Sequence, residues 1–129
     1  MQAAGTATRY SHLGIGIGEM RMFEPVNSSL GLDAVVEASA AAPVLVFLHD
    51  PYCPISGRAY EQVERIEATV HMIDVDAHSA LGREVAARTG IRHQSPQAIV
   101  FVNGRAAWHA SHGGITAVAL EAALQATAT

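Results

Sequence analysis

The chain of 129 residues contains no lysine, one cysteine and few aromatic residues, which make up 5% of the sequence. A single cysteine cannot form an internal disulfide, so a disulfide-stapled secreted fold is excluded and a cytoplasmic location is expected. The eight cationic residues are all arginines, scattered along the chain, and the formal net charge is −4 at pH 7. Because nucleic-acid partners require clustered positive charge, we expect no nucleic-acid binding.

Long hydrophobic runs are also missing. The longest apolar stretch, residues 40–48, is much shorter than the roughly 20 residues that a membrane-spanning helix needs. The N-terminus shows no basic region followed by an apolar one, as a signal peptide would. We therefore expect no membrane association and one domain that buries its own core.

Residues 1–21 are rich in glycine, alanine and threonine and show no helix or strand period. The glycines of residues 14–18 are not preceded by a predicted strand and are not followed by a lysine, so they do not indicate a phosphate-binding loop. We predict a flexible N-terminal extension over residues 1–21 and a folded domain over residues 22–129.

Within that domain, strand-like and helix-like hydrophobic patterns alternate. The predicted strands cover residues 22–26, 44–48 and 70–75, followed by a hairpin of residues 98–102 and 106–109 around Asn103-Gly104. Helices are expected after Asn27-Ser28-Ser29, ending before Pro43, after Cys53, around Leu81, ending at Thr89-Gly90, and after Thr116. This order predicts an α/β fold in which helices flank a central mixed sheet.

The lone cysteine, Cys53, is the candidate nucleophile. Pro54 suits the first position of a helix, which places Cys53 at the N-cap. Free N–H groups and the positive end of the helix dipole both favour a thiolate there. Ile55 and Ala59 have the spacing of the buried helix face. The alternative is that Cys53 is a small hydrophobic core residue without chemistry.

Three motifs add a resemblance to a known family. Residues 53–56 (Cys-Pro-Ile-Ser), residues 92–97 (Arg-His-Gln-Ser-Pro-Gln) and residues 108–112 (Trp-His-Ala-Ser-His) together resemble the monothiol bacilliredoxins, over roughly residues 22 to 126. The resemblance implies a thioredoxin-like fold and a cis Ser95–Pro96 bond opposite Cys53. It also implies that Cys53 removes bacillithiol, the glutathione substitute of certain bacteria, from mixed disulfides with proteins.

The same resemblance implies the partners and the substrate-binding residues. The partners would be S-bacillithiolated proteins and a recycling low-molecular-weight thiol, with bacillithiol as co-substrate, no other cofactor and no metal, in a monomer or weak dimer. The substrate-binding candidates flank the thiol or the proline: Tyr52, Pro54, Ile55, Ser56, Ser95, Pro96 and Gln97.

Two of these candidates have specific expected roles. Ser56 stands where a dithiol enzyme has its second cysteine, so it can donate a hydrogen bond to the thiolate but cannot form a disulfide. Gln97 either orients the substrate or stitches the sheet edge.

The candidate modulators of the thiol are His49, Asp50, His93 and His112. In the family, small hydroxylated residues follow the histidine, whereas here Asp50 does. A carboxylate near the sulfur would raise the thiol pKa, unless Asp50 points to solvent or to His49. Arg58 and Arg92 are candidates for binding the carboxylates of a small thiol, although solvated surface arginines are an equally good interpretation.

Three other interpretations of the chain stay open. His109 and His112 with Cys53 invite a metal-site hypothesis, but the spacing does not match zinc motifs and we expect no metal there. An iron–sulfur carrier would use Cys53 and an external thiol from each of two subunits. A non-catalytic interaction module would keep the fold while Asp50 keeps the thiol protonated.

Overall fold

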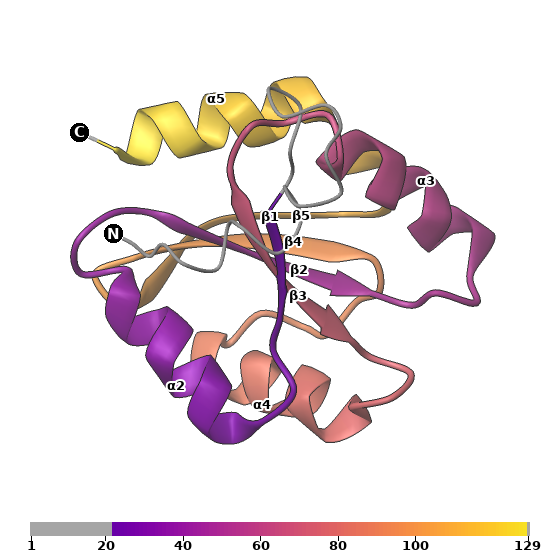
Figure 1. The fold of residues 1–129 in the computed structure, drawn as a ribbon, viewed down its shortest axis with the longest axis horizontal. Helices are drawn as coiled ribbons and strands as arrows, with labels where there is room; N and C mark the ends of the chain where they lie inside the picture. Colours follow the sequence, from indigo (N-terminus) through magenta and orange to yellow (C-terminus); the bar gives the residue numbers. More distant parts are fainter. Residues whose placement is uncertain (1–21, 129) are drawn as a thin grey trace, which may run out of the picture.

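The computed structural model describes residues 22–128, and these residues form a five-stranded mixed sheet flanked by helices on both faces (Figure 1). The predicted extension over residues 1–21, with its glycine-rich segment, lies outside the described residues. The strand order across the sheet is β1-β3-β2-β4-β5. The predicted α/β class and the predicted order of elements are confirmed.

The strands follow the predicted segments within one or two residues. They are β1 (Met22–Pro25), β2 (Val44–His49), β3 (Thr69–Asp74), β4 (Gln97–Val102) and β5 (Arg105–Ser111). β1 and β2 both pair in parallel with β3, whereas β4 pairs antiparallel with β2 and with β5. The two β-α-β crossovers and the final hairpin therefore lie in one sheet.

The helices begin and end where local signals place them. They are α2 (Ser29–Ala38), α3 (Pro54–Val63), α4 (Ser79–Thr89) and α5 (Ala117–Thr127). Ser28 and Thr116 cap α2 and α5 through their side-chain oxygens, which accept hydrogen bonds from helix N–H groups. Gly90 ends α4 in the left-handed conformation, which glycine adopts without a steric penalty.

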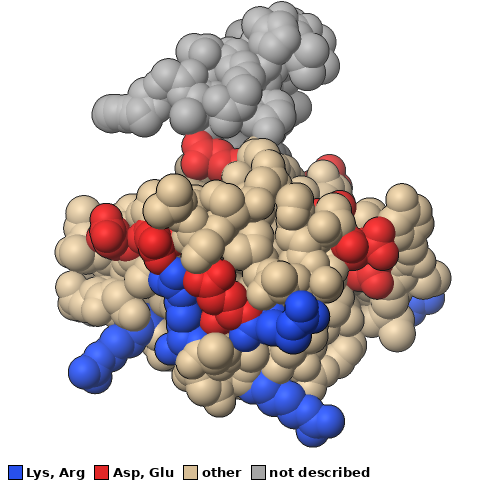
Figure 2. Space-filling view, turned by 90° about the horizontal axis from the view of Figure 1, so that it is seen from below, with Lys and Arg blue, Asp and Glu red and all other residues tan. Residues whose placement is uncertain are grey.

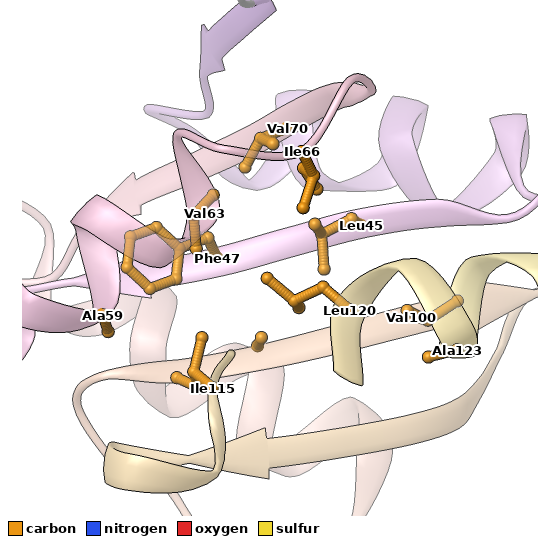
Figure 3. Close-up of a cluster of buried hydrophobic side chains, with 11 residues drawn as sticks. Leu45, Phe47, Ala59, Val63, Ile66, Val70, Val100, Ile115, Leu120 and Ala123 are labelled. Atoms are coloured by element: carbon orange, nitrogen blue, oxygen red, sulfur yellow. The ribbon is translucent and has the colours of Figure 1, made fainter. Parts of the chain in front are cut away.

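Alternating strand residues divide the core between the two faces of the sheet. Leu45 and Phe47 of β2 belong to the cluster beneath α3 and α5, and Val46 and Leu48 belong to the cluster beneath α2 and α4. Figure 3 shows the first cluster, in which Leu120 of α5 lies over the strands. A continuous apolar run such as β2 is typical of a central strand that is covered on both faces.

The sheet topology brings three chain segments to one edge. β4 and β5 are antiparallel to each other and β4 is antiparallel to β2, so the end of β2, the start of β4 and the end of β5 lie together. A short 3₁₀ helix, η3 (His112–Gly114), which the sequence patterns did not predict, follows β5 at this edge. The His112 N–H donates a hydrogen bond of 3.2 Å to the Pro96 carbonyl and ties the last two segments together.

The surface charges are mixed in sign. Figure 2 shows the face that α2 and α4 cover, where acidic and basic side chains lie next to each other. No helix within residues 22–128 is long and apolar enough to cross a membrane.

Candidate active site around Cys53

Cys53 is the N-cap residue of α3, with Pro54 at the first helical position, as the sequence predicts. Its side chain is partly exposed and forms no capping hydrogen bond, while its carbonyl accepts a bond of 2.9 Å from the Gly57 N–H. The thiol is therefore reachable from solvent and lies beside the free N–H groups of the first helical turn. The interpretation of Cys53 as a sealed core residue is wrong.

The Ser95–Pro96 segment lies beside the connection that carries Cys53. Leu48 of β2 pairs with Gln97 of β4, so the chain leaving β2 toward Cys53 and the chain entering β4 meet at one sheet edge. The Ser95–Pro96 peptide bond is cis, the isomer that the resemblance implies. The Ser95 hydroxyl oxygen is buried and has no hydrogen-bond partner within the described residues.

Ser56 is fully buried and its hydroxyl is engaged below the thiol. Its oxygen lies 2.8 Å from His49 Nδ1 and accepts a hydrogen bond of 2.9 Å from the Asp50 N–H. Whether Ser56 donates to or accepts from the histidine depends on which ring nitrogen carries the proton. Ser56 thus holds the end of β2 against the first turn of α3, and the structure shows no bond from it to Cys53.

His49 is held between aromatic rings and carboxylates. Its ring lies 5.4 Å from that of Phe47 and 5.0 Å from that of Tyr60, measured between ring centroids. Burial lowers the pKa of His49, and the Asp74 and Asp50 carboxylates oppose part of that shift. The imidazole ring is consequently neutral at neutral pH, and only one of its two nitrogens carries a proton.

Asp50 does not simply point to solvent. Its Oδ1 accepts a hydrogen bond of 3.0 Å from the Tyr52 N–H, which closes a small turn just before Cys53. The Asp50 carboxylate also opposes part of the lowering of the His49 pKa. Asp50 therefore shapes the β2–α3 connection through both its backbone and its side chain.

The loop that precedes β4 is braced from inside the protein. Gln97 is 2% exposed, and its side-chain amide donates a hydrogen bond of 3.1 Å to the Arg92 carbonyl. Of the two roles expected for Gln97, this arrangement matches the structural one, in which its side chain holds neighbouring backbone in place, and not direct contact with a substrate. His93 packs against α4, because a Cβ atom at Gly82 would lie 2.7 Å from the His93 ring. Only glycine permits this close approach while the ring keeps its place.

The residues that flank Cys53 present apolar groups to solvent. Tyr52 is 79% exposed and Ile55 is 52% exposed, so the expectation that Ile55 lies on the buried helix face is wrong. The buried residues of α3 are Ser56, Ala59 and Val63, so Ser56 takes the inward position in the first turn and Ile55 lies beside the buried face. Pro54 is exposed as well. In contrast, Pro96 is buried.

His112 lies at the same edge as Cys53, in an unusual backbone conformation. Its φ of 51° is in the left-handed region, which residues with a Cβ rarely occupy. Residues 22–128 contain no cluster of three or more His, Cys, Asp or Glu side chains arranged to hold a metal ion.

The aromatic setting of His49 and the glycine beneath His93 were not anticipated from the sequence. The strand period offered one signal, because Phe47 and His49 are two residues apart and share a face. Gly82 within a helical pattern offered another. The contacts of Tyr60, which stacks on Phe23 and lies tilted against His49, had no local signal, since they join three separate elements.

Comparison with solved structures defines the class of protein. A thioredoxin-fold structure described as a candidate oxidoreductase aligns with a TM-score of 0.74 and 30% identity, covering 79% of this chain and 93% of its own. A mutant thioredoxin from Halobacterium salinarum aligns with a TM-score of 0.66 and 22% identity, covering 84% of this chain and 92% of its own. Thioredoxin from Fasciola hepatica aligns with a TM-score of 0.64 and 12% identity, covering 81% and 98%. The chain is thus a thioredoxin-fold protein with a single cysteine at the position described above.

The family model described as monothiol bacilliredoxin BrxC matches residues 24–120. The chain belongs to the monothiol bacilliredoxin family, and its class is that of a thiol oxidoreductase.

Proposed function

We propose that this protein removes bacillithiol from mixed disulfides with proteins, using Cys53 as its only nucleophile. The observation that carries the proposal is the placement of a partly exposed, unpaired thiol at the N-cap of α3, beside the Ser95–Pro96 segment. The first helical turn supplies N–H groups and a positive dipole end that stabilise an anion at this place.

The reaction has two exchange steps. In the first, the Cys53 thiolate attacks the bacillithiol sulfur of the mixed disulfide, the protein–bacillithiol S–S bond breaks, and the substrate protein leaves as a thiolate that takes a proton from water. In the second, an external thiolate attacks the new disulfide on Cys53 and restores the Cys53 thiolate, leaving a small-molecule disulfide. One disulfide is consumed and one is formed, so the electrons balance.

The exposed side chains next to Cys53 support a protein substrate. Tyr52 and Ile55 place an aromatic and an aliphatic group on either side of the thiol. Large apolar groups at an exposed site are typical of contact surfaces for other proteins. Ser95 lies at the adjacent sheet edge, where its backbone is proposed to pair with an extended substrate segment.

The test is a transfer experiment followed by intact mass spectrometry. A reporter protein carrying one bacillithiol adduct is mixed with the wild-type chain, and both masses are followed in time. We expect the adduct to appear on Cys53 while the reporter loses it. Cys53→Ser, with unchanged circular dichroism and thermal unfolding, should show only the rate measured without added protein. An undiminished rate in Cys53→Ser, or no adduct on Cys53, contradicts the proposal.

A further inference from the structure

A groove of about 580 Å³ lies along α3 and is lined by residues from Ile55 onward. One wall consists of Ile55, Arg58 and Gln62, whose spacing of three and four residues places them on one side of the helix. The opposite wall includes His112 and Thr116. Because Ile55 comes two residues after Cys53, the groove begins at the end of α3 that carries the thiol.

The polar groups at the far end of the groove already have partners. Gln62 Oε1 accepts a hydrogen bond of 2.9 Å from the Ala117 N–H, and Thr116 Oγ1 accepts one of 3.1 Å from the Ala119 N–H. Both bonds hold the first turn of α5. These two side-chain oxygens therefore already accept hydrogen bonds from the backbone of α5.

Arg58 is different, because its guanidinium forms no ion pair or hydrogen bond within the described part of the chain. An arginine is charged at all physiological pH values and presents paired donors that match a carboxylate. Glu61 also lines the groove, so an anion would have to sit closer to Arg58 than to Glu61. A guanidinium that has no partner among residues 22–128, on a groove that begins two residues after Cys53, is suited to bind an anionic ligand.

We propose that this groove binds the carboxylate-bearing end of a low-molecular-weight thiol whose sulfur is attacked by Cys53, and that Arg58 binds the carboxylate. The inference rests on the proposed function, since it needs such a thiol at Cys53. Arg58 follows Cys53 by five residues, or about 7.5 Å along the helix axis. A thiol bound in this way needs several bonds between its sulfur and its carboxylate.

The first test compares two small disulfides with and without Arg58. Bacillithiol disulfide, whose malate moiety carries carboxylates, and neutral hydroxyethyl disulfide are each reacted with wild type, Arg58→Gln, Arg65→Gln and Arg92→Gln. Arg65 is a matched control, because it is an exposed arginine beyond the far end of α3 and does not line the groove. We expect Arg58→Gln to slow exchange with bacillithiol disulfide by about five- to tenfold.

The decisive result is whether Arg58→Gln slows exchange with the charged disulfide only. The hydroxyethyl disulfide rate should be unchanged in Arg58→Gln, and the loss with bacillithiol disulfide should shrink in about 1 M salt. Glu61→Gln should raise the rate with bacillithiol disulfide, because it removes the competing carboxylate. An equal loss with both disulfides, no loss, or a loss that follows Arg92→Gln or Arg65→Gln overturns the inference.

A binding measurement separates the inference from the proposed function. S-methyl bacillithiol cannot exchange, so its binding is followed by NMR shifts of the backbone amides of Gly113 and Ile115, which line the groove. Shifts in wild type that disappear in Arg58→Gln support the groove even if Cys53 proves unreactive. Normal exchange at Cys53 without these shifts and without discrimination between the disulfides overturns the groove and leaves the proposed function standing.

Discussion

The two helical faces of the sheet use arginine in opposite ways. On the α2/α4 face, Arg88 bonds to both Glu84 and Asp33, and Ser29 donates a further hydrogen bond of 2.8 Å to Glu84. On the α3/α5 face, Arg58 lines a groove and forms no such bond within the described residues. Ion pairs join the two helices on the first face, whereas Arg58 on the second face has no charged partner among residues 22–128.

The difference shows that arginine joins two helices on one side of the sheet and lines a groove on the other. A partly buried histidine also lies on a strand at each side. His49 lies with Phe47 on the α3 side, and His71 lies with Ile73 on the α2/α4 side. The comparison can therefore be tested with matched substitutions, one on each face.

The largest expected effect comes from removing one fully buried leucine on each face. Leu120→Ala and Leu32→Ala should each lower the free energy of unfolding by about 2–5 kcal/mol, because both leave a cavity in a packed cluster. Only Leu120→Ala should also slow exchange at Cys53, since Thr116, the N-cap residue of α5, lines the groove. Urea unfolding and exchange rates under folding conditions measure both quantities.

An equal loss of exchange rate in Leu32→Ala and Leu120→Ala would show that the two faces are not separable. An unchanged rate in both would show that the position of α5 does not matter for the thiol.

The next effect is a loss of stability in mild acid. Burial lowers the pKa of both His49 and His71, and nearby carboxylates, Glu24 in the case of His71, only partly oppose it. As the pH falls through about 6.5, the unfolded chain takes up protons that the folded chain does not, so stability decreases. Each histidine contributes a slope of at most about 1.4 kcal/mol per pH unit.

Urea unfolding at a series of pH values between about 7 and 5 measures this slope. His49→Asn and His71→Asn should each flatten it by their own share, whatever their effect on absolute stability. If both variants keep the wild-type slope, the acid loss has another origin.

The smallest effect is expected for the surface network. Arg88→Gln removes the bonds to Asp33 and Glu84 and should lower Tm by about 1–4 °C, as exposed ion pairs contribute little. Arg58→Gln should leave Tm unchanged. Thermal unfolding in low and high salt compares the two, and the Arg88 effect should diminish in high salt. A larger loss in Arg58→Gln than in Arg88→Gln would reverse the contrast between the faces.

Local signals in the sequence predicted most of the fold. Proline after Cys53 marked the start of α3, and Asn103-Gly104 marked the hairpin. The hairpin prediction is supported by the turn itself, because Asn103 and Gly104 both have a positive φ, the conformation that an Asn-Gly pair favours. The 3₁₀ turn at His112 was not predicted, because such a short element is set by its contact with Pro96 and not by a hydrophobic period.

The site was predicted less completely than the fold. The N-cap position of Cys53 and the cis Ser95–Pro96 bond were expected in advance, but the contacts of Ser56, the inward position of Gln97 and the exposure of Ile55 were not. A periodic pattern tells which residues share a face. It does not tell whether that face meets a neighbour at a given turn.

What the sequence by itself determined is the series of helices and strands and the single thiol at a helix start, because caps, turns and alternation act between residues close together in the chain. Only the tertiary structure decided that the segments around Cys53, Pro96 and His112 meet at one sheet edge, and that Arg58 lines a groove without a partner among the described residues. Those outcomes depend on strand order and on packing between distant segments, and no local pattern encodes either of them.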